Sequence, residues 1–367
     1  MSWAVAGGGT GGHVTMALAL AEEIRARGGR PVLLGTDQGL ERTLVPEAGF
    51  ELVTFDARQV MGQRLLARVA ALFGLLRTTF AARRALRAHG ATAVVSVGGY
   101  ASMPAVAAAA LMRLPIALIE PNAIPGRANR LMARVAKRVF VGFEGAQGHL
   151  PVPAERVQRL GIPLRRALVD AFADRPERKP EPPFRLLVAG GSQGARQVNE
   201  AMMEIAPRLD ADRVTIFHQS GADDRDRVAE AYAAAGLEAE VVAFTDDMPA
   251  RYAWADLAVC RSGALTVAEL ALAGLPSLLV PYPYAADDHQ AANAEALASP
   301  GADGAPGARM LSSRPLDVDA LASAIAELFS EPERLVQMKR ALASRARPDA
   351  AREIVDACAE VFGPPST

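Results

Sequence analysis

Cysteine is scarce in this chain, which has only Cys260 and Cys358 among its 367 residues. The two lie far apart and lack the paired spacing of a metal site, so the sequence excludes a cysteine-based metal centre. The sequence before the first strand-like run also lacks the basic, apolar and small-residue regions of a secretory signal peptide. These absences predict a protein of the reducing cytoplasm.

Long apolar runs are missing as well. In the arginine-rich segment 64–87, the uncharged stretch from Val69 to Leu76 is much shorter than the ~20 residues that a membrane-spanning helix needs. Large apolar residues recur there at helical spacing, namely Leu65, Leu66, Val69, Leu72, Phe73, Leu75, Leu76 and Phe80. Such a helix either lies on a bilayer surface or turns an apolar face to the core and leaves its arginines in solvent.

The net charge of −1 hides an uneven distribution of charge along the chain. Residues 1–165 carry 20 Lys and Arg against 10 Asp and Glu, whereas the remainder carries 20 against 31. The first half is therefore expected to meet an anionic partner. Because arginines and large apolar residues are mixed in segment 64–87, a phosphorylated lipid or a membrane surface fits better than nucleic acid.

What the chain does have is a regular alternation of apolar strand-like runs and helical segments. In the first half, strands are expected at 3–6, 31–34, 93–97, 116–119 and 139–141, with helices from about residue 15, around 63–88 and at 104–112. In the second half, strands are expected at 185–189, 214–218, 241–243, 257–260 and 277–280. This alternation predicts an α/β protein of two doubly wound domains with parallel sheets and crossover helices.

The length of the chain exceeds what one hydrophobic core usually fills, so two domains are expected. The proline-rich stretch between Pro163 and Pro183 disfavours both helix and sheet interior, and it marks the boundary. We therefore assign residues 1–163 to the first domain and 164–346 to the second. The last segment, 347–367, contains a helix that we expect to pack back on the first domain.

Two glycine-rich turns each leave an apolar strand and open a helix. The first spans Gly7 to Gly12 and is followed by His13, and the second spans Gly190 to Gly194. Glycine lets the backbone approach a ligand closely, and the free N–H groups and dipole of the following helix favour negative charge. Two such turns predict two nucleotide-type α/β halves that face one cleft.

The first turn fits the pattern G-x-G-x-x-G, and Asp37 stands where dinucleotide enzymes bind a ribose. Against a dinucleotide, His13 occupies the helix entrance, where a pyrophosphate needs bare backbone. The imidazole suits a general base, because its unperturbed pKa lies near neutrality. An equally good alternative is a histidine that caps the helix or lines the cleft.

A third glycine turn, Arg261 to Thr266, follows the strand expected at 257–260. Backbone amides from Ala264 to Thr266 are placed to hold a diphosphate. Glu269 can accept hydrogen bonds from vicinal ribose hydroxyls, because a carboxylate offers only acceptors. The alternative is an acid in the first helical turn that balances the helix dipole.

Pro281 to Asn293 forms a polar loop at the carboxyl end of a strand, where open α/β sheets bind ligands. Gln290 and Asn293 can read sugar hydroxyls there. The run Asp287 to His289 is a candidate for a metal site, but adjacent residues in an ordinary loop rarely share one ion. No metal is therefore expected.

A series of motifs covers nearly the whole chain in a fixed order. They are GGGTGGH (7–13), VGGYAS (97–102), EPNAIPGRAN (120–129), GIPLR (161–165), GGSQGARQVN (190–199), FTDDM (244–248), CRSGALTVAEL (260–270) and DDHQAANA (287–294). In this order they resemble glycosyltransferase family 28, the MurG-type N-acetylglucosaminyltransferases. The resemblance implies a GT-B fold, in which the second Rossmann-like domain mainly holds the donor nucleotide and the first holds a lipid acceptor.

The resemblance also implies site residues. On the acceptor side they are Thr10, Gly11 and Gly12 beside the reacting sugar or the acceptor pyrophosphate, Asn122 and Asn129 along the first domain, and His13 and Glu120 as candidates for the base. On the donor side they are Arg165 and Thr245 at the uracil, Ser192 and the helix start Ala264, Leu265, Thr266, Val267 and Ala268 at the phosphates, Glu269 at the ribose, and Gln290 at the GlcNAc hydroxyls.

Three motif positions, Ile119, Pro121 and Ile162, depart from the family pattern. Ile119-Glu120-Pro121-Asn122 stands where the family usually has His-Glu-Gln-Asn, and Ile162 replaces the usual asparagine before Pro163. Loss of that histidine leaves His13 and Glu120 as candidates for proton transfer. If the histidine is essential in the family, slow turnover or an altered acceptor is expected here.

By this resemblance, the chain transfers GlcNAc from UDP-GlcNAc, with inversion, to the 4-hydroxyl of undecaprenyl-diphosphate-linked MurNAc-pentapeptide in peptidoglycan synthesis. It implies no cofactor, no nucleic-acid partner, and a peripheral place on the anionic cytoplasmic face of the cell membrane. Three alternatives stay open: a related GT-B enzyme that uses another acceptor or epimerises a UDP-sugar, a dinucleotide oxidoreductase, and a catalytically silent UDP-sugar-binding protein.

Overall fold

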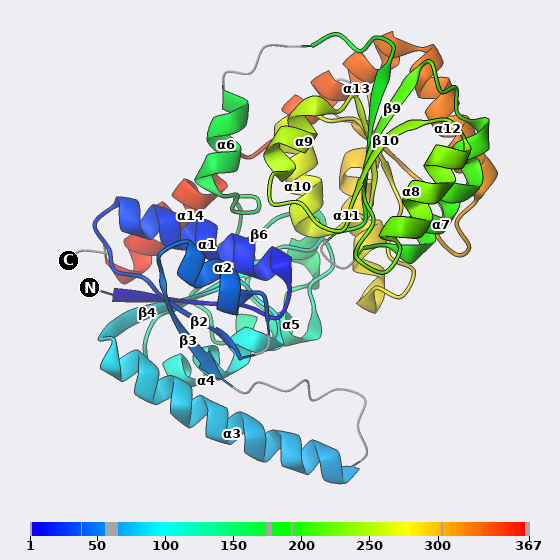
Figure 1. The fold of residues 1–367 in the computed structure, drawn as a ribbon. Helices are drawn as coiled ribbons and strands as arrows, with labels where there is room; N and C mark the ends of the chain where they lie inside the picture. The colour runs from blue at the N-terminus through cyan, green and yellow to red at the C-terminus, as the bar shows by residue number, and fades with distance from the viewer. Residues whose placement is uncertain are drawn as a thin grey trace. The chain divides into compact units, whose positions relative to one another are not determined.

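The computed structural model describes residues 2–37, 39–55, 65–173, 178–191, 194–301 and 304–363, with the backbone alone for 65–73. The chain divides into two compact units. One consists of Met1–Arg166 together with Arg347–Thr367, and the other of Ala167–Ala346. In Figure 1 the blue and cyan elements and the red C-terminal helix α14 belong to the first unit.

A parallel sheet forms the centre of the first unit. Its seven strands, as far as the chain is described, run in the order β3-β2-β1-β4-β5-β6-β7, and each neighbouring pair is parallel. They are β1 (Ser2–Ala6), β2 (Val32–Thr36), β3 (Glu51–Phe55), β4 (Ala91–Ser96), β5 (Ile116–Glu120), β6 (Arg138–Val141) and β7 (Val157–Arg159). The central strands read as continuous apolar runs, because helices cover both faces of the sheet.

The helices of the first unit come from both ends of the sequence. They are α1 (Gly11–Ala26), α2 (Glu41–Glu47), α3 (Leu65–Ala88), α4 (Met103–Leu111), α5 (Arg127–Ala133) and α14 (Ala350–Phe362). α1 packs against α2 and α14, and α3 packs against α4. Figure 1 shows α3 on the side of the sheet opposite α1 and α2. No helix in the described ranges is long and apolar enough to span a bilayer.

A second parallel sheet forms the centre of the other unit. Its described strands run in the order β10-β9-β8-β11-β12-β13. They are β8 (Phe184–Ala189), β9 (Val214–Gln219), β10 (Glu238–Val242), β11 (Leu257–Cys260), β12 (Ser277–Leu279) and β13 (Ala308–Met310). Its helices are α7 (Arg196–Ile205), α8 (Arg225–Ala234), α9 (Met248–Trp254), α10 (Ala264–Ala273), α11 (His289–Ala298), α12 (Val318–Ser330) and α13 (Pro332–Ala343), while α6 (Arg166–Ala173) begins at the division between the units.

The expectation of two parallel, doubly wound sheets is confirmed, and this is the architecture that the GT-B motifs imply. Strands expected at 3–6, 116–119, 185–189 and 257–260 are present with their ends shifted by at most one residue. Sequence patterning missed β3, β7 and β13, which all lie at sheet edges. An edge strand is covered on fewer sides, so it does not need the continuous apolar run that marks a central strand.

Candidate functional site

The first glycine turn joins β1 to α1 and lies tightly against the end of β4. A Cβ on Gly7 would collide with the side chain of Val97, so only glycine fits there. Thr10 then caps α1, because its hydroxyl accepts a hydrogen bond from the His13 amide at 3.5 Å. This cap explains why α1 begins at Gly11 rather than near residue 15, as the sequence predicted.

His13 stands in the first turn of α1, and its ring makes a hydrogen bond to the cap. Nδ1 lies 2.7 Å from Thr10 Oγ1, and the ring lies so close to Gly99 that an added Cβ there would be 3.3 Å from Cε1. Loss of solvent around the imidazole lowers its pKa from 6.5 to about 4, and the negative charge of Glu41 acts in the opposite direction. His13 is therefore neutral at pH 7, and a neutral imidazole has one nitrogen that can accept a proton.

Glu120 ends β5 as a fully buried carboxylate. It accepts hydrogen bonds from the amide N–H of Asn122 at 2.8 Å, the amide N–H of Gly126 at 3.2 Å and Asn129 Nδ2 at 2.8 Å. Burial raises its pKa to about 7. Asn129 in turn accepts the amide N–H of Gly99 at 3.1 Å. The carboxylate thus fixes, through Asn129, the turn that lies against the imidazole.

The predicted acceptor-side residues therefore gather at the carboxyl ends of β1, β4 and β5. Asn122 also belongs to this group, because its side-chain N–H donates to Glu120 at 3.3 Å. The residues that the structure places in this group are Thr10, Gly11, Gly12, His13, Glu120, Asn122 and Asn129. Ligands of open α/β sheets bind at this edge, as the sequence analysis assumed.

The three departures from the family pattern, Ile119, Pro121 and Ile162, are buried. Ile119 lies in β5 with no exposed surface, Pro121 follows directly, and Ile162 is 3% exposed. Ile162 packs on Gly142, where an added Cβ would lie 2.7 Å from its Cγ1. All three positions are thus buried in this chain, and none supplies a polar side chain to the group around His13.

Arg165, which the resemblance places at the uracil, belongs to the first unit and binds Glu22 of α1. Its Nε and Nη2 donate to one carboxylate oxygen of Glu22 at 2.9 and 2.7 Å. The backbone N–H of Arg166 donates to the other oxygen at 3.2 Å. Glu22 therefore fastens the chain at the end of the first unit, and the uracil contact of Arg165 stays a prediction.

In the second unit, the third glycine turn leads from β11 into α10. Gly263 at the helix start has no side-chain cap, and the Val267 N–H bonds back to the Gly263 carbonyl at 2.9 Å. The N–H groups of Ala264, Leu265 and Thr266 precede this first intrahelical bond, so they point out of the helix end. A helix start of this kind suits an anion.

Glu269 is the sixth residue of α10. It lies more than a full turn from the helix start, so the alternative of a first-turn acid that balances the dipole is wrong. Its Oε2 accepts the hydroxyl of buried Tyr252 at 2.8 Å. Burial raises the pKa of Glu269 to about 7. Of the two residues that precede it, Val267 is buried and Ala268 is half-buried.

The polar loop after β12 is held by Arg261 and Gln290. Arg261 donates to the carbonyls of Val280 and Pro281 at 3.2 and 3.0 Å. Gln290 Oε1 accepts the Tyr282 N–H at 2.9 Å. The side-chain carbonyl of Gln290 thus serves the loop, while its amide nitrogen supplies donors for a ligand hydroxyl.

Two further donor residues were predicted from the motifs. Thr245 Oγ1 accepts the Asp247 N–H at 3.2 Å, and Asp247 caps α9 by accepting the Ala250 N–H at 3.1 Å. Thr245 therefore belongs to the ordered turn before α9. Ser192 lies outside the described residues, so its contact with a phosphate stays a prediction.

Comparison with known proteins places these features in a family. The glycosyltransferase family 28 N-terminal domain matches residues 3–141, and the family 28 C-terminal domain matches residues 185–354. A relative from Anaeromyxobacter dehalogenans, named UDP-N-acetylglucosamine--N-acetylmuramyl-(pentapeptide) pyrophosphoryl-undecaprenol N-acetylglucosamine transferase, is 44% identical over 98% of this chain and 93% of its own. The chain belongs to glycosyltransferase family 28. A Myxococcus xanthus protein of the same name is 41% identical over 98% of this chain and 92% of its own.

Solved structures agree with membership of family 28. The crystal structure of Acinetobacter baumannii MurG has a TM-score of 0.77 at 30% identity, covering 98% of this chain and 99% of that one. A UDP-GlcNAc 2-epimerase from Neisseria meningitidis has a TM-score of 0.69 at 11% identity, covering 98% and 100% of the two chains. At that identity the epimerase shows a shared fold alone.

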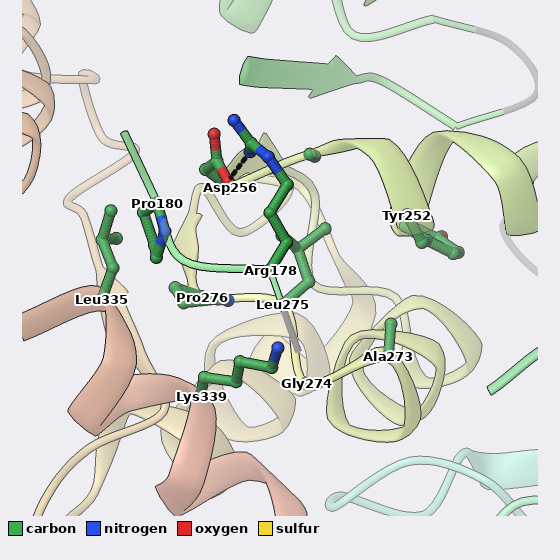
Figure 2. Close-up of a pocket in the computed structure, with 11 residues that line it drawn as sticks. Arg178, Pro180, Tyr252, Asp256, Ala273, Gly274, Leu275, Pro276, Leu335 and Lys339 are labelled. Carbon is green, nitrogen blue, oxygen red and sulfur yellow. Dashed lines mark hydrogen bonds and ion pairs between the residues drawn. The ribbon is translucent and has the colours of Figure 1, made fainter. Parts of the chain in front are cut away.

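A small cavity of about 30 Å³ borders Tyr252 in this family 28 chain. Figure 2 shows Arg178 paired with Asp256 on one side of it, with Lys339 on another. The pair fastens the segment before β8 to the second unit. A volume of ~30 Å³ is the share of one water molecule in the liquid, so the cavity does not hold a nucleotide.

Residues of the segment Asp287 to His289, the candidate metal site, make contacts within the protein. Asp288 pairs with Arg314 at 2.7 Å, and His289 Nδ1 lies 2.8 Å from the Ala286 carbonyl oxygen. Within the part of the chain that the structure describes, no group of three or more His, Cys, Asp or Glu is arranged to hold a metal ion.

Two residues that contact the candidate site, Glu41 at Gly9 and Tyr252 at Glu269, were not predicted from the sequence. Each lies in a short helix outside the motifs and reaches the site only through folding. For Tyr252 the sequence holds no signal. For Glu41 there is none either, because the close approach of its side chain to Gly35 and Gly39 is visible only in the structure.

Proposed function

We propose that this family 28 chain transfers GlcNAc from UDP-GlcNAc to the 4-hydroxyl of undecaprenyl-diphosphate-linked MurNAc-pentapeptide, forming lipid II for peptidoglycan. The observation that carries the proposal is the 44% identity, over 98% of the chain, to a transferase whose name states these substrates. The acceptor-side group around His13 and the open start of α10 supply the chemistry that the transfer needs.

The reaction is a direct displacement with inversion. The acceptor hydroxyl oxygen attacks the anomeric carbon of GlcNAc, the bond from that carbon to the diphosphate oxygen breaks, and its electrons leave with UDP. The hydroxyl proton passes to His13, at the ring nitrogen that Thr10 does not engage. General-base assistance of this kind is worth roughly 10²- to 10⁴-fold in rate.

Negative charge grows on the diphosphate as its bond to the sugar breaks. The N–H groups from Ala264 to Thr266, together with the dipole of α10, stabilise this charge because they are oriented before the reaction begins. Glu269 accepts the ribose hydroxyls, and Gln290 binds the GlcNAc hydroxyls. The remaining donor contacts carried over from the motifs are Arg165, Ser192, Thr245, Val267 and Ala268. The transfer changes no oxidation state, so the proposal includes no cofactor.

Glu120 was the second candidate for the base. Its carboxylate has no exposed surface and already accepts hydrogen bonds from Asn122, Gly126 and Asn129. This environment supports a positioning role, in which Glu120 orients Asn129 along the acceptor. Proton transfer is then assigned to His13, which keeps part of its surface exposed.

The first domain is proposed to meet the membrane and the acceptor, and the second to hold UDP-GlcNAc. Three helices of the first unit expose large apolar side chains, namely Leu76 and Phe80 on α3, Leu111 on α4 and Leu131 on α5, and Val135 is exposed just after α5. Exposed arginines accompany two of these helices: Arg84 and Arg87 on α3, Arg127 at the start of α5 and Arg134 at its C-terminal cap. This mixture suits the anionic cytoplasmic face of the cell membrane, where the chain is proposed to lie peripherally.

The decisive test is the release of UDP from UDP-GlcNAc with and without a soluble lipid I analogue. Release that depends on the acceptor, together with a disaccharide product, is the expected result. Release of UDP with a different acceptor alone would instead identify a related transferase. Conversion to another UDP-sugar without acceptor would identify an epimerase, and binding without any turnover would identify a silent sugar-nucleotide-binding protein.

His13→Ala tests the proposed base within the same assay. Turnover is expected to fall by roughly 10²- to 10⁴-fold, because the hydroxyl proton then has no positioned acceptor. UDP affinity, measured by calorimetry, is expected to stay within about twofold of the parent, since the proposed donor groups other than Arg165 lie on the second unit. A variant that turns over at the parental rate would remove His13 from the mechanism.

A further inference from the structure

Glu41 is a buried carboxylate that none of the motifs contains. It opens α2 and is 1% exposed. Its Oε1 accepts the Thr36 N–H at 2.8 Å and the Thr36 hydroxyl at 2.5 Å. The same carboxylate accepts the Gly9 N–H, at 3.2 Å to Oε1 and 3.3 Å to Oε2. One side chain thus ties the end of β2 to the middle of the first glycine turn.

The chain leaves room for this carboxylate at three glycines. A Cβ on Gly8 or Gly39 would collide with the carboxylate oxygens, and one on Gly35 would lie 3.0 Å from Glu41 Cγ. Gly9 itself has a φ of +81°, a conformation that other residues rarely adopt. The hydrogen bond that the Gly9 N–H donates to Glu41 therefore holds this flexible segment in one geometry immediately before Thr10.

The charge of Glu41 is not balanced by an ion pair with any residue that the structure describes. Its oxygens are instead satisfied by hydrogen bonds from Thr36 and Gly9, which leave the negative charge in place to act on a neighbouring group. His13 is the nearby group that the charge acts on, because Glu41 opposes the fall in the pKa of His13 caused by burial. A general base becomes an imidazolium when it takes a proton, and a fixed negative charge stabilises that cation.

We propose that Glu41 is a positioning residue for the transfer reaction: it fixes Gly9 and hence the helix start that carries Thr10 and His13, and its charge stabilises the imidazolium formed at His13. This inference rests on the proposed function for its chemical step. The proton moves from the acceptor hydroxyl to His13, and it passes to solvent once the products have left, which restores the neutral imidazole; Glu41 accepts no proton in this step.

Glu41→Gln tests the proposal, because glutamine keeps the size of the side chain but removes its charge and one acceptor. Two measurements are needed: kcat with UDP-GlcNAc and a soluble lipid I analogue, and hydrogen exchange of the amides in residues 7–13. We expect kcat to fall by about 10- to 100-fold, in line with a misplaced base. The KM for UDP-GlcNAc should stay within about twofold, and exchange at the Gly9 amide should quicken by about tenfold or more.

Glu47→Gln is the matched control, since Glu47 ends the same helix and is exposed. It is expected to leave kcat and Gly9 exchange unchanged. Thr36→Val is the second variant and keeps the Glu41 charge while removing one donor to it. We expect a smaller loss of kcat, about threefold, with intermediate exchange at Gly9. If Glu41→Gln does not fold, Thr36→Val serves as the test on its own. Parental kcat and parental Gly9 exchange in Thr36→Val would then overturn the proposal.

The outcomes separate this proposal from the proposed function. Parental kcat in Glu41→Gln, or a loss of donor affinity equal to the loss of kcat, would show that Glu41 does not position the base. A wild-type chain that releases no UDP with the acceptor would instead overturn the transfer itself. In that case unchanged exchange at the Gly9 amide would still refute the positioning role of Glu41.

Discussion

Single side chains in the second unit set the protonation state of the donor site. Glu269 is buried enough that its pKa rises to about 7, while the hydrogen bond from Tyr252 acts to lower it. A carboxylate accepts ribose hydroxyls, whereas its protonated form has lost acceptor capacity. In its proposed role at the ribose, Glu269 therefore binds in the charged form, and the protonated form has to release a proton first.

The sign of the resulting pH dependence follows from the raised pKa. Uridine affinity is expected to fall as the pH drops from 8 to 6, by up to about tenfold per pH unit below the pKa. Uridine is the ligand of choice, because it carries the ribose without a phosphate that titrates in this range. Calorimetry across this pH range measures the effect. Uridine binding by Glu269→Gln should be weak and independent of pH.

Tyr252→Phe is the second arm of this test. Removing the hydroxyl takes away a bond that favours the charged carboxylate, so the pKa of Glu269 should rise and the loss of uridine affinity should begin at a higher pH. An unchanged pH profile in this variant would contradict the proposed control of Glu269 by Tyr252.

At the scale of elements, α3 has an exposed face that its packing on α4 does not cover. Phe80 is 59% exposed, and Leu76 lies one turn before it. The sequence left two possibilities for this segment, a helix that faces the core or one that lies on a bilayer. The described part of α3 has one face of each kind: Ala82 and Leu86 are buried in the first unit, whereas Leu76 and Phe80 are exposed.

Phe80→Asp tests whether the exposed face of α3 meets lipid. The substitution removes an aromatic side chain that would insert into the bilayer, and it adds a negative charge. Binding to phosphatidylglycerol vesicles should therefore weaken by about tenfold or more. Sedimentation with these vesicles, and with phosphatidylcholine vesicles for comparison, measures the effect. Met310→Asp on β13 of the second unit is the matched control. Equal binding by both variants would contradict a membrane role for α3.

At the scale of the whole molecule, the last helix belongs to the unit in which the chain begins. Trp3 of β1 contacts Phe362 of α14 with ring centroids 5.4 Å apart, and Arg27 at the C-terminal cap of α1 pairs with Asp356 at 2.6 Å. Ile354 in the middle of α14 has no exposed surface. Residues more than 300 positions apart in sequence therefore share one core.

Ile354→Ala should destabilise the first unit by about 2–5 kcal/mol, because it leaves a cavity between α14 and α1. The two tryptophans report on the units separately, since Trp3 lies in the first and Trp254 in the second. In a Trp254→Phe background, urea unfolding followed by Trp3 fluorescence should shift to lower urea. Glu360→Ala, at an exposed position of the same helix, is the control. A shift of the same size in both would contradict the packing role.

Much of this architecture could be predicted from sequence, because central strands of a parallel sheet are buried on both faces. Such strands read as continuous apolar runs, and β11 was located with both ends correct. The short strand β7 mixes polar and apolar residues, so no such run marks it. The start of α1 was placed late, because the glycines of the turn continue into the helix itself.

The site was predictable where function depends on the backbone and unpredictable where it depends on tertiary contacts. Glycine-rich turns can be recognised in the sequence, because few other residues allow such backbone conformations. The pairing of Tyr252 with Glu269 joins two helices and has no local pattern. Glu41 was equally hidden, since a single glutamate in a helix resembles any solvated one until its burial is known.

The return of α14 to the first unit determines the order in which a newly made chain can complete its parts. The second unit is a continuous stretch, Ala167–Ala346, and can close as soon as it leaves the ribosome. At translation rates of about 5–20 residues per second, a stretch of this length delays α14 by roughly ten to forty seconds. Throughout that interval α14 cannot pack on α1, so the unit that is synthesised first is completed last. The apolar surface of α1 that stays exposed is where a chaperone would bind the nascent protein.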